Sequence, residues 1–310
     1  MTSSLAVGDE VDVAIERVAH DGHFVARHEG QVLFVRHTAP GERVRIRVTG
    51  VGKSGKFVFA DAVDVLLPSP HRVSPPCVFA GRCGGCDFQH LELSYQRELK
   101  TAVLIEQLTR LGNLDAADPL LTRIEVRPLS ADESGLDWRT RMEYSTDGRG
   151  RIGLKAHGSH ELVTIDACAV AAHEIASDGL TNTPWAPGSD VRAVITSTGE
   201  RQILPGTSPD NPLLRERVGE NTFAVFTRGF WQAHPRAPEV FTEAVVRLAD
   251  VRTGDHVIDL YAGAGLFSVP LIKEVGDGGR VDAVEGDPGA CKNLRANIRG
   301  FSNAAAHASA

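Results

Sequence analysis

Three cysteines within ten residues constrain this chain more than any other feature. Cys77, Cys83 and Cys86 are separated by five and by two residues, with glycines among them. Thiolates at this spacing can turn toward one soft metal centre, because glycine allows the backbone to fold tightly around it. Three ligands leave such a centre incomplete, so a distant residue must supply the fourth. We expect Cys168 to supply it, which would tie two separate segments of the chain together.

The spacing alone leaves the identity of the metal open. Four thiolates suit either a zinc ion or an iron–sulfur cluster. A structural disulfide would require an oxidising compartment, and residues 1–4 have neither the basic nor the apolar part of an export signal. Cys291 stands outside this set. It lies on an expected helix after an acidic strand end, where a packing role fits better than a nucleophilic one.

Composition bounds the class of protein. A length of 310 residues suggests two or three domains, and 42% hydrophobic with 24% charged residues is ordinary for a globular protein. No apolar run is long enough to cross a bilayer, so we expect a cytoplasmic monomer without a membrane partner. The formal net charge of −7 argues against a general polyanion binder, so nucleic-acid contacts would need local patches.

Residues 1–66 have the pattern of a small closed β-barrel of OB-like type. Period-two alternation and the positions of Gly- and Pro-containing turns together predict four strands. They span residues 11–15, 31–36, 44–48 and 57–65. On the third strand Arg43, Arg45 and Arg47 share one face, which suits the phosphates of a nucleic acid. A solvated strand face explains this row equally well.

Residues 67–235 are expected to form a central α+β domain that holds the cysteines. Prolines form a stiff linker at its beginning. A helix is predicted over residues 94–111, and we expect it to pack on the C-terminal domain. Five strands are predicted, at residues 138–145, 151–156, 162–165, 191–197 and 223–226. Trp138, Arg139 and Arg141 could stack on RNA and neutralise it. By themselves these residues favour a buried ring with two surface charges.

Residues 236–310 have the pattern of an incomplete α/β domain of Rossmann type. The order is helix, strand, glycine turn, helix and strand, and the second strand ends in an acidic residue. These elements are predicted at residues 238–248, 256–261, 262–265, from 267, and 280–285. The alanine-rich end, residues 303–310, is the one segment of low complexity.

The third glycine of the dinucleotide fingerprint is replaced by Ser268. A pyrophosphate binder needs that glycine for close packing of helix and strand, with its charge on the helix N-terminus. S-adenosylmethionine has no phosphate and does not impose this demand. Glu285 has two carboxylate oxygens that can accept both ribose hydroxyls. The pattern therefore favours S-adenosylmethionine over a nicotinamide cofactor.

Several motifs occur together along the chain. They are Ser69-Pro70-His71-Arg72, the three-cysteine loop, Gln89-His90-Leu91, Trp138-Arg139-x-Arg141, residues 158–161 with Cys168, Phe230-Trp231-Gln232 and residues 259–265. In these motifs the chain resembles the iron–sulfur-containing RNA uracil-5-methyltransferases, which carry an N-terminal TRAM barrel and use S-adenosylmethionine. Two departures are His234, where an asparagine is usual, and Leu266, where some relatives have a polar cofactor contact.

The resemblance implies ligands and contacts for this chain. Its metal would be a 4Fe–4S cluster held by Cys77, Cys83, Cys86 and Cys168. S-adenosylmethionine would be bound by Gln232, Tyr261 and Glu285, with Asp259, Gly263 and Gly265 around it. The family's substrate is RNA, either tRNA or 23S rRNA. From the residue patterns described above, we expect Arg43, Arg45, Arg47, Arg139 and Arg141 to contact it.

The resemblance also implies a reaction, methylation of uridine at C5. In that family a cysteine thiolate adds to C6 of the base, C5 takes the methyl group, and a glutamate removes the C5 proton. The family's cysteine follows an Asp-Pro-Pro-Arg motif that these 310 residues do not contain, and the glutamate lies further on. We therefore expect a truncated chain that does not methylate RNA. The alternative is a non-catalytic RNA-binding protein with an iron–sulfur or zinc centre.

Overall fold

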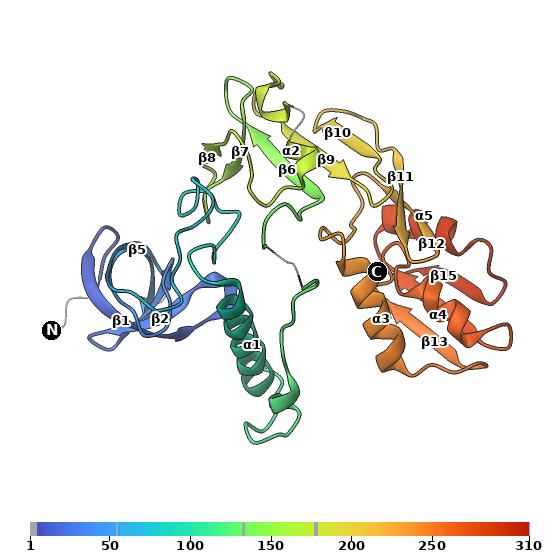
Figure 1. The fold of residues 1–310 in the computed structure, drawn as a ribbon, viewed down its shortest axis with the longest axis horizontal. Coiled ribbons are helices and arrows are strands. Elements are labelled where there is room, and N and C mark those ends of the chain that lie inside the picture. Colours follow the sequence, from blue (N-terminus) through green and yellow to red (C-terminus); the bar gives the residue numbers. More distant parts are fainter. Residues whose placement is uncertain (1–4, 54, 132–133, 177–178, 310) are drawn as a thin grey trace. The chain divides into compact units, whose positions relative to one another are not determined.

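The computed structural model describes residues 5–53, 55–131, 134–176 and 179–309. They form two compact units (Figure 1). The first comprises Met1–Pro128 and Lys155–Val163, and the second comprises Leu129–Leu154 and Thr164–Ala310. The export-signal expectation for residues 1–4 lies outside the described residues. Across the described ranges, no helix combines the length and the apolar character that a bilayer crossing requires.

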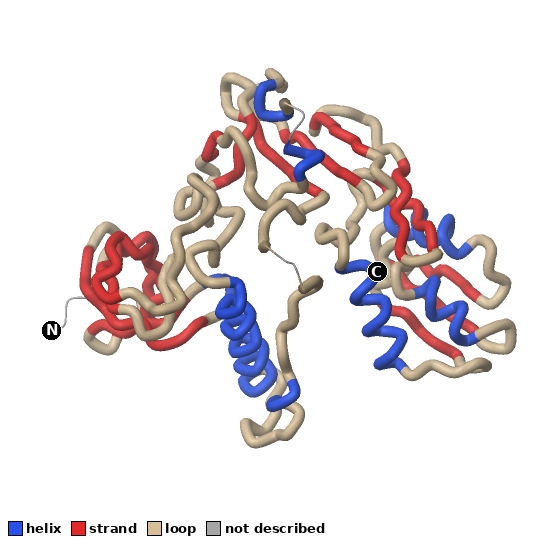
Figure 2. The backbone as a smooth tube through the Cα atoms, in the orientation of Figure 1, coloured by secondary structure: helices blue, strands red, loops and turns tan. Residues whose placement is uncertain are grey.

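A closed five-stranded barrel begins the first unit (Figure 2). Its strands are β1 (Glu10–Val18), β2 (Phe24–His28), β3 (Gln31–Arg36), β4 (Arg43–Val51) and β5 (Phe57–Leu67). They pair in the order β1-β2-β3-β5-β4, with β3 and β5 parallel and the other neighbours antiparallel. Leu33, Val44 and Val58 are fully buried inside it, as period-two alternation requires. The predicted OB-like barrel is confirmed.

Strand β2 was not predicted from the sequence, and its burial explains why. Its first three residues, Phe24, Val25 and Ala26, are all buried. Phe24 and Ala26 belong to the barrel core, whereas Val25 is buried outside it. A strand covered on both faces shows no alternation, so the period-two signal is absent.

Helix α1 (Leu93–Arg110) packs on the barrel. Tyr95, Leu99 and Val103 are spaced by four residues, so they share one side of the helix and join the core cluster of the barrel. The extent of the helix agrees with the prediction. The helix was expected to pack on the C-terminal domain. Its apolar side instead packs on the barrel, within the first unit. A short 3-10 helix, η2 (Leu121–Arg123), follows.

A buried carboxylate fastens the proline-rich segment to the barrel. Glu42 has no solvent exposure, and its oxygens accept hydrogen bonds from the backbone N–H groups of Ala39 (2.9 Å) and Ser69 (3.0 Å). The Arg72 guanidinium donates to both oxygens, at 2.6 and 2.7 Å. A buried charge held this completely fixes the path of the chain between barrel and cysteine loop.

A five-stranded sheet, of order β10-β9-β6-β7-β8, follows. Its strands are β6 (Arg141–Thr146), β7 (Ile152–Lys155), β8 (Leu162–Thr164), β9 (Asp190–Ile195) and β10 (Arg201–Pro205). Between β8 and β9 lie the short helices α2 (His173–Ala176) and η3 (Leu180–Asn182). Strand β6 begins three residues later than predicted. The preceding residues make backbone hydrogen bonds outside the sheet, as described below.

The end of the second unit is a parallel sheet flanked by helices (Figure 1). Its elements are α3 (Ala237–Ala249), β13 (His256–Leu260), α4 (Ser268–Val275), β14 (Arg280–Glu285), α5 (Pro288–Ile298) and β15 (Ala304–Ala308), with strand order β13-β14-β15. The hairpin of β11 (Leu213–Val218) and β12 (Asn221–Phe226) packs into the same core through Phe223 and Val225. The predicted α/β pattern is confirmed.

The alanine-rich end forms a strand that the sequence analysis did not predict. Low complexity gave no strand signal, yet residues 304–308 form β15, parallel to β14 in register from Val281↔Ala304 to Glu285↔Ala308. Ala304 and Ala306 pack against the core of the second unit. Small side chains suit a strand that a helix covers closely, and α5 provides that cover.

Candidate cofactor site and its supporting segments

The candidate cofactor site is built on the turn after β13. Tyr261 has a positive φ of 61°, and Gly263 and Gly265 follow with φ of 57° and 86°. This left-handed backbone is easy for glycine and strained for tyrosine. The turn is held down by the Ala262 N–H, which donates to the Val284 carbonyl at 3.0 Å. The turn therefore lies at the carboxyl ends of two parallel strands, where open α/β sheets bind ligands.

Glu285 closes this turn from the neighbouring strand. Its Oε2 accepts the Gly263 N–H at 2.7 Å, and its Oε1 accepts the Asp287 N–H at 2.7 Å. Asp287 in turn caps helix α5, its Oδ1 accepting the Ala290 N–H at 2.7 Å. Each carboxylate oxygen of Glu285 retains a lone pair for a further donor. The carboxylate is thus oriented before any ligand arrives.

Ser268, which breaks the glycine fingerprint, has a definite role here. It is fully buried, and its Oγ donates a hydrogen bond to Asp259 Oδ2 at 2.6 Å. Burial raises the pKa of the Asp259 carboxyl, the Ser268 hydrogen bond opposes this, and the charge of Glu285 adds to the rise. Two acidic side chains consequently lie beside the glycine turn. The sequence pattern marked Ser268 only as a missing glycine, although a hydroxyl nine residues after a strand carboxylate was a usable signal.

The side chains of Gln232 and Tyr261, two other predicted cofactor contacts, are accessible to solvent. Tyr261 is 90% exposed, and Gln232 is partly exposed. Beside Gln232, Trp231 is only 6% exposed and packs on Phe223 with ring centroids 5.3 Å apart. The buried tryptophan anchors the segment and leaves the glutamine side chain available.

The Trp138–Arg141 segment supports the Phe230–Gln232 segment. The Trp138 ring stacks on His234 at 5.7 Å, and both the N–H and the hydroxyl of Thr140 donate to the Ala233 carbonyl at 2.8 Å. Arg141 Nη1 reaches the Gly229 carbonyl at 3.4 Å. Contacts therefore reach the chain on both sides of Phe230–Gln232.

Arg141 is held in a buried ion pair. Its Nη2 lies 2.9 Å from Glu216 Oε1, and the two side chains are 11% and 4% exposed. Burial lowers the pKa of the Arg141 guanidinium, and the pair with Glu216 acts against that shift. Glu216 Oε2 also accepts the Ser197 N–H at 2.9 Å. A guanidinium used in this way has little left to donate to an RNA phosphate.

Cys168 occupies a turn that the same segment holds. The Asp137 and Arg139 N–H groups donate to the carbonyls of Ala169 (3.1 Å) and Val170 (2.7 Å), and the Ala171 N–H closes the turn onto Cys168 O (3.1 Å). Arg139 is thus fixed through its backbone, while its Nε is buried without a hydrogen bond. Cys168 itself is partly buried.

The other three predicted ligands lie together in sequence on a turn of the first unit. Cys77, Cys83 and Cys86 are all partly buried. The Ala80 N–H donates to Cys77 O (3.1 Å), and the Gly85 N–H donates to Cys83 Sγ (3.4 Å). The Gly84 N–H donates to the Lys155 carbonyl at 3.0 Å, and a Cβ added to Gly84 would lie 2.7 Å from the backbone nitrogen of His157. Glycine is therefore required where the loop meets residues 155–157.

Across the described ranges, no three His, Cys, Asp or Glu side chains are grouped as a metal site would need. The structure places Cys77, Cys83 and Cys86 in the first unit and Cys168 in the second. Cys291 is 3% exposed, and its Sγ donates to Glu285 O at 3.1 Å. Its predicted packing role is confirmed.

The arginine row on β4 is largely paired with acids. Arg45 Nε lies 2.9 Å from Asp12 Oδ1, and Arg47 Nη2 lies 2.7 Å from Glu10 Oε1, both across the β1–β4 pairing. Arg43 is exposed on the same face. A phosphate would have to compete with these carboxylates for Arg45 and Arg47.

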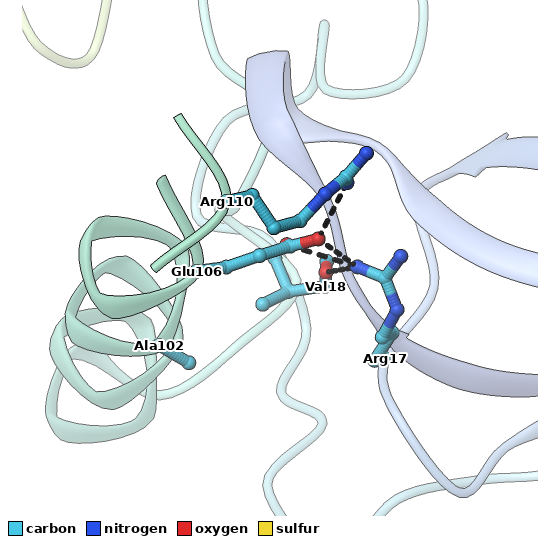
Figure 3. Close-up of a pocket in the computed structure, with 5 residues that line it drawn as sticks. All are labelled: Arg17, Val18, Ala102, Glu106 and Arg110. Carbon is cyan, nitrogen blue, oxygen red and sulfur yellow. Dashed lines mark hydrogen bonds and ion pairs between the residues drawn. The ribbon is translucent and has the colours of Figure 1, made fainter. Parts of the chain in front are cut away.

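Two further arginines border a cavity between β1 and α1, which the sequence did not reveal (Figure 3). The cavity has a volume of about 420 Å³ and is lined by Arg17, Val18, Ala102, Glu106 and Arg110. Arg17 and Arg110 both lie 2.9 Å from Glu106 Oε1. The shared carboxylate offsets one of the two positive charges and ties the helix to the barrel.

Two family models match the chain. The TRAM domain matches residues 5–63, and the TRM5/TYW2 methyltransferase domain matches residues 238–305. These ranges correspond to the barrel and to the parallel sheet with the candidate cofactor site.

Similar proteins modify RNA. An uncharacterised RNA methyltransferase of Streptomyces coelicolor is 39% identical over 95% of this chain and 72% of its own length. The 23S rRNA (uracil(1939)-C(5))-methyltransferase RlmD of Chromohalobacter salexigens is 42% identical over 51% of this chain and 32% of its own length. The fold matches the Pyrococcus abyssi tRNA (uracil-54, C5)-methyltransferase, crystallised with S-adenosyl-L-homocysteine. That match has a TM-score of 0.65 and 18% identity, covering 96% of this chain and 79% of the other.

Proposed function

The chain belongs to the RNA methyltransferases, and from this membership we propose that it serves the methylation of uridine C5 in RNA by S-adenosylmethionine. The observation that carries the proposal is the Glu285 carboxylate fixed against the glycine turn, in a chain that also has a TRAM barrel. Relatives that act on uracil C5 in 23S rRNA and in tRNA support the choice of base. Either RNA is a candidate substrate.

The residues at the site fit S-adenosylmethionine. Glu285 would accept the ribose hydroxyls, since each of its oxygens makes one hydrogen bond and can accept another. The carboxylates of Asp259 and Glu285 would also favour a cofactor that carries a sulfonium cation. Gly263 and Gly265 allow close approach of the backbone, and the exposed Tyr261 and the accessible Gln232 would complete the contacts. When bound, the cofactor supplies the methyl group.

The proposed reaction also requires a nucleophile, because C5 of uracil is too electron-poor to take a methyl group directly. Cys291 is unsuited to this task, since its thiol is buried and donates to the Glu285 carbonyl. The four remaining cysteines are the proposed metal ligands. We therefore expect the polypeptide of residues 1–310 to bind S-adenosylmethionine and RNA without methylating uridine.

The metal centre belongs to the proposal as well. The donor chemistry of Cys77, Cys83 and Cys86 fits a 4Fe–4S cluster: the thiols are partly buried, and a backbone N–H already points at Cys83 Sγ. Cys168 is the proposed fourth ligand. Iron and sulfide analysis of protein purified without oxygen tests this, with Cys168→Ser as the variant and Cys291→Ser as its control. Bound zinc without iron would contradict the cluster.

Binding of S-adenosylmethionine is the first test of the function. Calorimetry should show that Glu285→Gln weakens binding about 10- to 100-fold, because hydrogen bonds to a charged acceptor are lost. Glu274→Gln, an exposed change on α4, should bind as the unmodified chain does. Equal affinity of all three proteins would contradict the assigned site.

Methyl transfer is the second test. The polypeptide is incubated with labelled S-adenosylmethionine and unmodified tRNA or 23S rRNA, and the product nucleosides are separated. Label at uridine C5 would support the reaction and overturn the expected inactivity of residues 1–310. RNA binding without any S-adenosylmethionine binding would favour the non-catalytic alternative.

A further inference from the structure

The outer surface of the barrel has a cluster of aromatic rings on two parallel strands. Phe34 lies on β3, opposite Phe59 on β5, and Phe57 precedes it by two residues on the same strand. The three ring centroids lie 5.6 to 5.8 Å from one another. His23, just before β2, lies 5.5 Å from Phe59, and His157 lies 5.7 Å from His23. We call these five residues the aromatic face.

The aromatic face is not part of the barrel core. The residues alternating with it, Leu33, Val35, Val58 and Ala60, are at most 1% exposed and fill the interior. Phe59 is 38% exposed, and His157 is exposed too. Outward positions of a solvated sheet normally carry polar residues, so a group of phenylalanines there indicates an interaction surface.

The neighbouring strand leaves these rings uncovered. Gly50 on β4 pairs with Phe59, and an added Cβ there would lie 3.8 Å from its ring. A Cβ at Gly52 would lie 2.5 Å from the Phe57 ring. Glycine therefore occurs at both places where a side chain would cover or displace a ring.

Electrostatics at the aromatic face favour a neutral partner group. Burial lowers the pKa of His23, and the neighbouring His157 and Arg36 lower it further, which favours the neutral form of its ring. Arg36 is itself paired with Asp87 at 3.0 Å. The β4 arginines that could bind phosphates, Arg45 and Arg47, are already paired with Asp12 and Glu10. Stacking should therefore contribute more to binding than phosphate contacts do.

The aromatic face continues onto the cysteine loop. His157 belongs to the segment on which Gly84 packs, and a Cβ at Gly22, next to His23, would lie 2.7 Å from the Asp87 Cβ. Both flanks of the face thus contact residues 84–87. A strand of RNA lying on the rings would pass beside the cysteines.

We propose that unpaired nucleobases of RNA stack on the aromatic face formed by His23, Phe34, Phe57, Phe59 and His157. This rests on the proposed function insofar as the partner is RNA. Base stacking on aromatic side chains tolerates any sequence and requires single-stranded segments. The surface therefore selects loops and unpaired ends over duplex, independently of the cofactor site.

The test compares binding of a single-stranded oligouridine of about a dozen nucleotides with binding of an RNA duplex of equal length. In the full chain, Phe34→Ala and Phe59→Ala should each weaken single-strand binding about 5- to 100-fold. Phe59→Leu, which keeps the apolar contact without the aromatic ring, should also weaken it, whereas Phe59→Tyr should not. Val63→Ala, another exposed change on β5, is the matched control.

Salt dependence separates stacking from phosphate binding. The dependence of affinity on salt should be the same in Phe59→Ala as in the unmodified chain, because no phosphate contact is removed. Wild-type affinity in both phenylalanine-to-alanine variants would overturn the proposal, as would a loss confined to an Arg45→Ala/Arg47→Ala variant. In either case S-adenosylmethionine binding is unaffected and the proposed function stands. A chain that binds neither RNA nor S-adenosylmethionine would overturn both.

Discussion

Removing the carboxylate of Glu216 should destabilise the second unit severely. Arg141 and Glu216 form an ion pair in which both side chains are nearly buried. In Glu216→Ala the guanidinium remains buried without its partner, and the Ser197 N–H loses its acceptor. Breaking a buried pair from one side costs about 3–5 kcal/mol of unfolding free energy, because the remaining charge is neither solvated nor paired.

Tryptophan fluorescence during urea unfolding measures this effect selectively. All three tryptophans, Trp138, Trp185 and Trp231, lie in the second unit, so the signal reports on that unit alone. The matched control is Glu143→Ala, which removes the carboxylate that pairs with Arg192 at 2.8 Å but is 58% exposed. That exposed pair should contribute less than about 1 kcal/mol.

A double variant distinguishes loss of the pair from loss of packing. Arg141→Met with Glu216→Leu removes both charges and keeps most of the volume, so it should recover much of the stability. Because Arg141 also donates to the Gly229 carbonyl, Glu216→Ala should weaken S-adenosylmethionine binding as well. A loss in Glu216→Ala no larger than in Glu143→Ala would refute the reasoning.

Three further outcomes are expected. Ser268→Ala removes the hydrogen bond that stabilises the charged form of Asp259, so its pKa should rise further, and S-adenosylmethionine affinity should fall more steeply toward acidic pH in calorimetric titrations. Glu42→Ala should cost about 3–5 kcal/mol in scanning calorimetry, whereas Glu16→Ala, in an exposed pair, should cost under about 1 kcal/mol. Burial lowers the pKa of His90 to about 4, so the folded state binds fewer protons than the unfolded one. Stability should therefore fall as the pH drops from about 6.5 toward 4, and His90→Gln, which keeps a donor for Thr38 O, should remove this acid dependence of the melting temperature.

Sequence patterns predicted many of the elements that have one buried face. Residues 31–36 were predicted as a strand after the Glu29-Gly30 turn and form β3 with the same limits, with Leu33 and Val35 fully buried. The helix at 94–111 was found through its spacing of apolar residues, and it spans Leu93–Arg110. Strand β2 and strand β15 were missed, since the first is buried on both faces and the second is made mostly of alanine. Strands β10 and β11 were missed as well, although β11 buries alternate residues on one face.

The site was predictable where local chemistry marks it and hidden where the fold brings distant residues together. The glycine turn and the acidic strand end identified Gly263 and Glu285, and the structure joins them by one hydrogen bond. No local pattern could show that Arg141 would pair with Glu216, seventy-five residues away. The aromatic face was hidden for the same reason, because Phe34 and Phe59 meet only through the parallel pairing of β3 and β5.

The Trp138–Arg141 segment illustrates how a motif can be explained without its expected ligand. Trp138 stacks on His234, Thr140 holds Ala233, and Arg141 pairs with a buried carboxylate. The N–H of Arg139 holds the turn that carries Cys168. Trp138, Thr140 and Arg141 are therefore explained by side-chain contacts inside the second unit, whereas Arg139 contributes through its backbone N–H, which any residue except proline could supply. Contact of Arg139 or Arg141 with RNA stays a proposal, and the internal contacts account for Trp138, Thr140 and Arg141 before RNA is considered.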